Sequence, residues 1–187
     1  MNISVVLLAG GESRRMGQDK ALLLFRGKPL WQLQLDLLRK MQPVETFVSA
    51  RFDPSWRPAD VQFISDIAPA CGPLGGLAST LAKIRTGHLL ALAIDMPLMK
   101  GEYLHSLCDQ IEPECGVLPM IGDRAEPLAA IYPKSAETDL VEALSGSDFS
   151  LQLLTRKLVT LGKLRFVNVS KDEQKYFRNF NKPEDFF

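Results

Sequence analysis

The residues best suited to chemistry stand near the start of the chain, in the segment LLAGGESRRMGQDKALL at positions 7–23. Two adjacent glycines follow an apolar run, and three cations come next: Arg14, Arg15 and Lys20. Glycines let backbone N–H groups close on a ligand, and guanidinium groups bind phosphate oxygens through paired hydrogen bonds. The segment therefore predicts a site for a nucleoside triphosphate or for the diphosphate that leaves it. The charges by themselves would also suit a solvated basic turn.

Two standard phosphate-binding loops do not match this segment. A P-loop has a glycine immediately before its lysine, whereas Lys20 follows Asp19. A dinucleotide fingerprint has the spacing G-x-G-x-x-G, which Gly10, Gly11 and Gly17 do not supply. These mismatches argue against a P-loop ATPase and against an NAD-dependent dehydrogenase.

Two acidic residues stand at the ends of strand-like runs further along the chain. Asp95 ends the run LLALAID, and Asp66 comes directly after VQFIS. Open α/β sheets bind ligands at the carboxyl ends of their strands, and Mg²⁺ prefers carboxylate and phosphate oxygens. Asp95 is therefore predicted to bind Mg²⁺, although by itself it could also cap a helix expected near residue 101. The stretch GPLGG at 72–76 adds a second glycine-rich turn, although such a turn alone is often only a tight turn.

The elements that must position these residues alternate between strand and helix in the first hundred residues. Strands are expected at 3–9, 45–50, 61–65 and 89–95, and helices at 29–40 and 72–84. Beyond them we expect strands at 115–122, 126–133 and 164–170, with helices at 135–146 and 150–158. This alternation predicts one α/β domain over residues 1–187, with a parallel sheet covered by helices on both faces. The two glycine-rich turns then follow the first and third strands, which we expect to end at adjacent positions.

The net charge, the cysteines and the N-terminal apolar run narrow the class of protein further. Lys+Arg and Asp+Glu number 22 each, so the net charge is zero, which argues against a nucleic-acid-coating protein. Three cysteines at unpaired spacings favour a reduced, cytoplasmic setting over a disulfide framework or a zinc site. The N-terminal apolar run is too short to span a membrane and lacks a basic leader, so we expect no membrane association.

The stretch LAGGESRRMGQDKALLLFRGKPL resembles the N-terminal signature of nucleotidyltransferases with a GT-A-like Rossmann fold. Within them it most resembles the molybdenum cofactor guanylyltransferases, whose version reads L-A-G-G-x-S-x-R-M-G-x-D-K. The resemblance implies a Rossmann-like three-layer sandwich with a mostly parallel central sheet, of the nucleotide-diphospho-sugar transferase type. It also implies that Arg15 and Lys20 act on the phosphates and that four residues wrap the base and sugar: Leu8, Ala9, Gly10 and Gly11.

Further residues take roles from the same resemblance. Asp66 is placed at the nucleotide, near the base or ribose, and Asp95, in the D-x-P form of Asp95-Met96-Pro97, is placed at the metal and the nucleotide. The tail pattern N-x-N-x-P-E puts Asn179 and Asn181 near the pterin substrate, although paired asparagines before a proline could equally cap a last helix.

The resemblance implies a complete reaction. The terminal phosphate of molybdopterin would attack the α-phosphorus of GTP, with Mg²⁺ as cofactor, giving molybdopterin guanine dinucleotide and pyrophosphate. The N-terminal half would bind the nucleotide and the C-terminal half the acceptor. Transient contact with other cofactor-biosynthesis proteins or with molybdoenzyme apoproteins would accompany this role.

Two other functions stay open. A cytidylyltransferase for the same cofactor tends to read L-A-A-G where this chain reads L-A-G-G. A non-catalytic carrier of the nucleotide or cofactor would not require the metal and phosphate residues. One departure concerns the second strand, after which the family often has an asparagine and this chain has Ser49 and Arg51. Because that asparagine would help to hold the nucleotide, the recognition of the base and sugar by this chain is less defined at this position.

Overall fold

The computed structural model describes residues 2–10, 19–66, 71–181 and 185. Its strands are β1 Ser4–Leu8, β2 Leu24–Phe25, β3 Lys28–Pro29, β4 Glu45–Ala50, β5 Gln62–Ser65, β6 His88–Ala93, β7 Gly116–Ile121, β8 Arg124–Ala125, β9 Ile131–Pro133 and β10 Leu164–Asn168. Its α-helices are α1 Leu30–Arg39, α2 Pro73–Lys83, α3 Gly101–Cys108, α4 Glu137–Leu144 and α5 Leu151–Thr160. Short 3₁₀ helices are η2 Lys20–Leu22, η4 Pro127–Ala129, η5 Lys134–Ala136 and η6 Gln174–Phe177.

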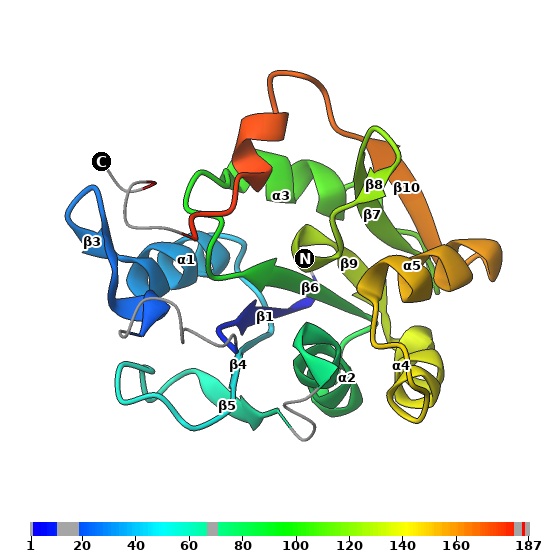
Figure 1. Ribbon diagram of the computed structural model, residues 1–187, viewed down its shortest axis with the longest axis horizontal. Coiled ribbons are helices and arrows are strands. Elements are labelled where there is room, and N and C mark those ends of the chain that lie inside the picture. The colour runs from blue at the N-terminus through cyan, green and yellow to red at the C-terminus, as the bar shows by residue number, and fades with distance from the viewer. Residues whose placement is uncertain (1, 11–18, 67–70, 182–184, 186–187) are drawn as a thin grey trace.

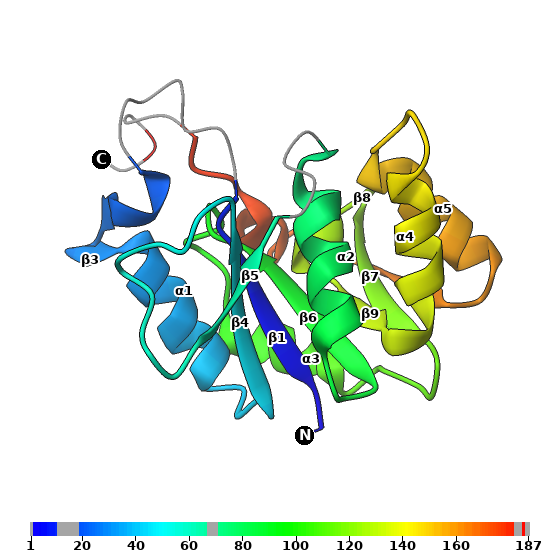
Figure 2. The same cartoon turned by 90° about the horizontal axis from the view of Figure 1, so that it is seen from below.

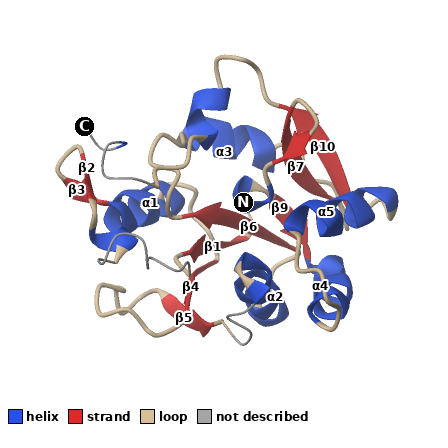
Figure 3. Cartoon of the chain, in the orientation of Figure 1, coloured by secondary structure: helices blue, strands red, loops and turns tan. Residues whose placement is uncertain are grey.

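A central sheet runs through the molecule with helices on both sides (Figures 1 and 3). Its strand order is β10-β7-β9-β6-β1-β4-β5, and β8 pairs with β7 outside this path. The pairs β1–β4, β1–β6, β4–β5 and β7–β10 are parallel, whereas β9 runs antiparallel to both β6 and β7. The mostly parallel sheet implied by the family resemblance is confirmed, and the parallel sheet predicted from the alternation of strand and helix holds for all strands of this sheet except β8 and β9.

The two faces of the sheet carry separate apolar cores. Alternate residues of β1 divide between them, because Val5 and Leu7 pack with α1 and α3, whereas Val6 and Leu8 pack with α2, α4 and α5. Helices α2 and α4 lie side by side over the second face (Figure 2). A strand buried on both faces has a continuous apolar sequence, which explains the SVVLL run.

Three of the differences between the sequence-based expectations and the structure concern strands. The predicted strand at 126–133 is instead η4 followed by β9, and the proline at 127 removes a donor that a longer strand would need. Strand β6 ends at Ala93, so Asp95 lies in the loop beyond it. The first and third predicted strands, β1 and β5, are not adjacent, because β4 lies between them.

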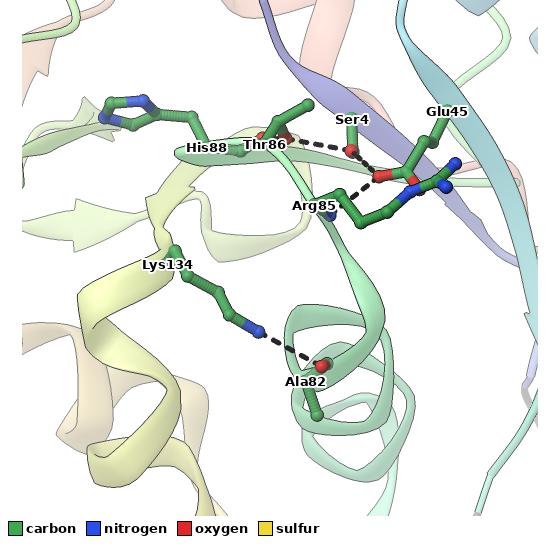
Figure 4. A network of polar contacts seen from close by, with 7 residues as sticks. All are labelled: Ser4, Glu45, Ala82, Arg85, Thr86, His88 and Lys134. Carbon is green, nitrogen blue, oxygen red and sulfur yellow. Dashed lines mark hydrogen bonds and ion pairs between the residues drawn. The ribbon is translucent and has the colours of Figure 1, made fainter.

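The amino ends of the strands are held by a polar network (Figure 4). Buried Glu45 accepts hydrogen bonds from the Ser4 hydroxyl at 2.7 Å, the Arg85 backbone N–H at 2.9 Å and the Arg85 guanidinium at 2.8 Å. Burial by itself raises the pKa of Glu45, but these donors outweigh it and the pKa is lowered. His88 contacts the backbone carbonyls of Glu112 and Cys115 at 3.1 and 3.3 Å. These contacts lie at the edge opposite the predicted site.

Two further observations concern the cysteines and the lengths of the helices. Cys71, Cys108 and Cys115 form no disulfide with one another. In the part of the chain that the structure describes, every helix is too short or too polar to cross a membrane.

Candidate functional site

The carboxyl ends of four neighbouring strands, β6, β1, β4 and β5, bring the predicted site residues to one edge of the sheet. The Ala9 N–H donates to the Ser49 carbonyl at 2.8 Å, and the Ile94 N–H donates to the Leu8 carbonyl at 3.1 Å. The Asp66 N–H donates to the Ala50 carbonyl at 3.1 Å. These bonds continue the sheet beyond its last paired residues, so the turns after β1, β5 and β6 start from fixed positions.

Asp66 lies against both glycine-rich turns. A Cβ atom at Gly10 would stand 2.3 Å from Asp66 Oδ2, and a Cβ at Gly76 would stand 2.6 Å from Asp66 Oδ1. At such separations a side chain on either glycine would force the carboxylate to move, so the carboxylate occupies space that these two glycines leave open. Although β4 separates β1 from β5, Gly10 and Asp66 meet because both extend past the strand ends.

Asp95 forms an ion pair with Lys20. The Lys20 Nζ lies 2.9 Å from Asp95 Oδ2, and the two side chains are 21% and 20% exposed. Lys20 also donates to the Asn181 side-chain oxygen at 2.6 Å. A cation near the start of the chain, a carboxylate from its middle and an amide near its end therefore converge at one point.

Neighbouring elements fix the backbone on each side of this ion pair. Asp19 accepts from the Ala21 N–H at 3.0 Å at the start of η2, which carries Lys20. Buried Gln34 of α1 donates to the Met96 carbonyl at 2.7 Å, and the Phe180 N–H donates to the Asp95 carbonyl at 2.8 Å. The loop after β6 is thus held from α1 and from the tail.

The alternative role of Asp95 as a helix cap does not agree with the structure. Helix α3 has Lys100 at its N-cap and no side-chain cap hydrogen bond, so Asp95 does not cap it. Asn181 lies beyond η6, and its amide oxygen accepts from Lys20. Asn179 is exposed.

Several predicted residues fall outside the described residues. Gly11, Arg14 and Arg15 belong to this group. Their predicted roles on the nucleotide and its phosphates stay predictions.

The hollows in the described surface include two of similar volume. The one beside the site has a volume of about 240 Å³ and is lined by the following residues: Ala9, Gly10, Asp19, Ala50, Arg51, Phe52, Asp53, Pro54 and Trp56. The other has a volume of about 290 Å³ and lies at α5, β7 and β10, where no predicted site residue lines it. The position of the first, beside Ala9 and Gly10, suits a ligand held at the end of β1.

Sequence reasoning did not foresee three contacts at this edge. Ser49 donates to Asp66 Oδ1 at 2.7 Å, Gly76 lies against both of these residues, and the Trp56 indole donates to Asp19 Oδ2 at 3.0 Å. A serine that follows Phe47 and Val48 near the carboxyl end of strand β4 was the one local signal available. The others depend on chain segments that meet only in the fold.

The chain resembles known proteins over most of its length. Residues 5–160 match the family model described as MobA-like NTP transferase domain. A protein named "Molybdenum cofactor guanylyltransferase" from Xanthomonas euvesicatoria is 35% identical over 182 residues, which are 96% of this chain and 89% of that protein. A protein named "Probable molybdenum cofactor guanylyltransferase" from Opitutus terrae is 34% identical over 182 residues, covering 96% of this chain and 90% of its own length.

Structural similarity agrees with these sequence matches. The crystal structure of molybdopterin-guanine dinucleotide biosynthesis protein A from Archaeoglobus fulgidus superposes with a TM-score of 0.77 at 25% identity. That superposition covers 98% of this chain and 94% of the other. The sheet, the convergence of Lys20 with Asp95 and the matched residues 5–160 lead to one conclusion: this chain belongs to the family of MobA-like NTP transferases.

Proposed function

We propose that this protein transfers GMP from GTP to molybdopterin, forming molybdopterin guanine dinucleotide and releasing pyrophosphate. The observation that carries the proposal is the Lys20–Asp95 pair, 2.9 Å apart, at the edge of the sheet where β1 and β6 end. The relatives' names add the identity of the donor and the acceptor. In the reaction, a terminal phosphate oxygen of the acceptor forms a bond to the α-phosphorus of GTP. The bond from that phosphorus to the bridging oxygen of the leaving diphosphate breaks.

The residues at this edge suit the cofactor Mg²⁺. Mg²⁺ in nucleotide sites takes one or two protein carboxylates and completes its coordination with phosphate oxygens and water. Asp95 supplies one such carboxylate, and within the described residues no three His, Cys, Asp or Glu side chains gather into a metal site of their own. We propose that Asp95 holds Mg²⁺ together with the phosphates of GTP. When bound, the ion neutralises phosphate charge.

Lys20 and Asp95 have opposite charges that match a metal–diphosphate complex. In the structure they satisfy each other at 2.9 Å. With GTP bound, the Lys20 ammonium would turn to the phosphate oxygens while the Asp95 carboxylate serves the ion. Arg15 would add a second cation to the departing diphosphate. The protein supplies positioning and charge rather than a covalent nucleophile.

We assign the remaining predicted residues to the two substrates. Leu8, Ala9, Gly10 and Gly11 would contact the base and sugar, with Asp66 beside them. In this proposal Asn179 and Asn181 would contact the pterin. The hydrogen bond from Lys20 to Asn181 supports placing the acceptor next to the phosphates. The N-terminal half would thus bind the nucleotide and the C-terminal half the acceptor.

The setting of the reaction belongs to the same proposal. Three cysteines without a disulfide support a cytoplasmic location. Transfer of the product would require transient contact with molybdoenzyme apoproteins or with other cofactor-biosynthesis proteins.

A turnover assay tests the proposal. Pyrophosphate release is measured with molybdopterin and Mg²⁺ present, using GTP, CTP or ATP as the donor. We expect turnover with GTP and its loss in Asp95→Ala. Preference for CTP would indicate a cytidylyltransferase, and nucleotide binding without turnover would indicate a carrier.

A further inference from the structure

Ser49 makes a hydrogen bond that its place in the sheet does not require. It lies in β4 opposite Leu8 of β1 and Ile64 of β5, and it is 1% exposed. Its backbone already takes part in the sheet, with its carbonyl accepting from Ala9. The hydroxyl points out of the strand toward α2 and donates to Asp66 Oδ1 at 2.7 Å.

The space around this hydrogen bond is closed on both sides. A Cβ at Gly76 would lie 2.4 Å from the Ser49 Oγ and 2.6 Å from Asp66 Oδ1. A Cβ at Gly10 would lie 2.3 Å from the other carboxylate oxygen. The carboxylate therefore lies between the turn after β1 and the first turns of α2, and one hydroxyl sets its rotation.

Asp66 keeps acceptor capacity for a ligand. Within the described part of the chain, Ser49 is the one side chain that donates to this carboxylate. Glu45, at the opposite edge, shows the contrasting case, because both of its oxygens accept protein hydrogen bonds. An ionised carboxylate accepts about four hydrogen bonds, so most of the capacity of Asp66 is left over.

We propose that Ser49 is a positioning residue for nucleotide selection: its hydroxyl holds the Asp66 carboxylate at the orientation that reads the donor edge of guanine. This inference rests on the proposed function. Guanine presents two neighbouring donors, its ring N1–H and its 2-amino group, and a carboxylate accepts such a pair side by side. Cytosine presents a single donor on the corresponding edge. A fixed carboxylate at this position therefore favours GTP over CTP.

A double-mutant cycle on nucleotide binding tests this role. Dissociation constants of GTP and CTP, with Mg²⁺ present, are measured by calorimetry for the wild type, Ser49→Ala, Asp66→Ala and the double variant. We expect Ser49→Ala to weaken GTP binding about tenfold, the effect of one hydrogen bond to a charged group. CTP binding should change less. In the Asp66→Ala background, Ser49→Ala should have no further effect, because Ser49 acts through Asp66.

Two more variants separate positioning from general loss of packing. Ser49→Thr keeps the hydroxyl and should bind GTP more tightly than Ser49→Ala. Ser4→Ala removes another buried serine hydroxyl that donates to a carboxylate at 2.7 Å, at the opposite edge (Figure 4), and should leave GTP binding unchanged. Thermal unfolding of each variant reports on the fold.

The outcomes distinguish this inference from the proposed function. Unchanged GTP binding in Ser49→Ala, or equal effects of that change with and without Asp66, would overturn the role of Ser49 while the proposed function stands. A wild type that prefers CTP would overturn the assignment of GTP as the donor, and with it the selective role of Ser49. A wild type that binds no nucleotide would overturn both.

Discussion

Replacement of Gly10 by alanine probes the site with a single methyl group. The backbone of Gly10 lies outside the left-handed region, so alanine adds no backbone strain. The new Cβ would stand 2.3 Å from Asp66 Oδ2, where an ordinary contact is at least 3.4 Å. The carboxylate must therefore retreat by about 1 Å. Gly76 and Ser49 lie against its other oxygen, so it has little room to do so.

The size of the effect follows from what the carboxylate loses. A displacement of about 1 Å breaks the 2.7 Å hydrogen bond from Ser49 to the Asp66 carboxylate. The carboxylate then loses the orientation in which it would contact the base. A hydrogen bond to a charged group contributes about 1.5–3 kcal/mol. We therefore expect the KM for GTP in Gly10→Ala to rise about 10- to 100-fold, with kcat changing less, because the contact is made in the ground state as well as in the transition state.

The assay is pyrophosphate release at varied GTP with saturating molybdopterin and Mg²⁺. Gly87→Ala is the matched control, since a Cβ there would meet no atom within 4 Å. It should leave the KM for GTP unchanged. If Gly10→Ala folds normally and its KM for GTP stays within about threefold of the wild type, less than the loss of one hydrogen bond would give, Asp66 does not contact the nucleotide.

Three other perturbations have defined outcomes. Lys20→Ala should lower kcat about 100-fold, as expected for a lost preorganised charge contact of about 3 kcal/mol. Replacement of the exposed Lys28 by alanine should leave kcat unchanged. Equal kcat values for the Lys20→Ala and Lys28→Ala variants would refute the role of Lys20. Chelation by EDTA should abolish turnover and added Mg²⁺ restore it, with Asp95→Ala needing more Mg²⁺; activity that survives chelation would exclude the ion. Glu45→Gln should lower the free energy of unfolding by about 2 kcal/mol at pH 7. Because the folded pKa of Glu45 is lowered, the difference in unfolding free energy between the wild type and Glu45→Gln is fully present above the ordinary glutamate pKa of about 4.3. It shrinks as the pH falls through the folded pKa. Chemical denaturation of both proteins at pH 7 and at pH 3 measures this difference, and a difference that is undiminished at pH 3 would show that the network is not responsible.

Local patterns in the sequence were sufficient to predict most elements. The strand at 45–50 has the predicted boundaries, and α1 and α2 lie within a residue or two of theirs, because apolar periodicity and the prolines at 29 and 73 act over a few residues. The alternation of these elements also determined the parallel sheet. The signature after β1 and the acids after β5 and β6 pointed to a single edge of that sheet, where the structure places Lys20, Asp66 and Asp95.

Only the tertiary structure decided which side chains meet. Lys20 contacts Asp95 and Asn181 across 75 and 161 residues of sequence, and no local pattern encodes such partners. The sequence suggested that β1 and β5 end at adjacent positions, but β4 lies between them. This position of β4 brings Ser49 to the Asp66 carboxylate. Short-range propensities fix the conformation of each segment, whereas strand order and packing between the two cores fix the distances between segments. The candidate site is built from those distances.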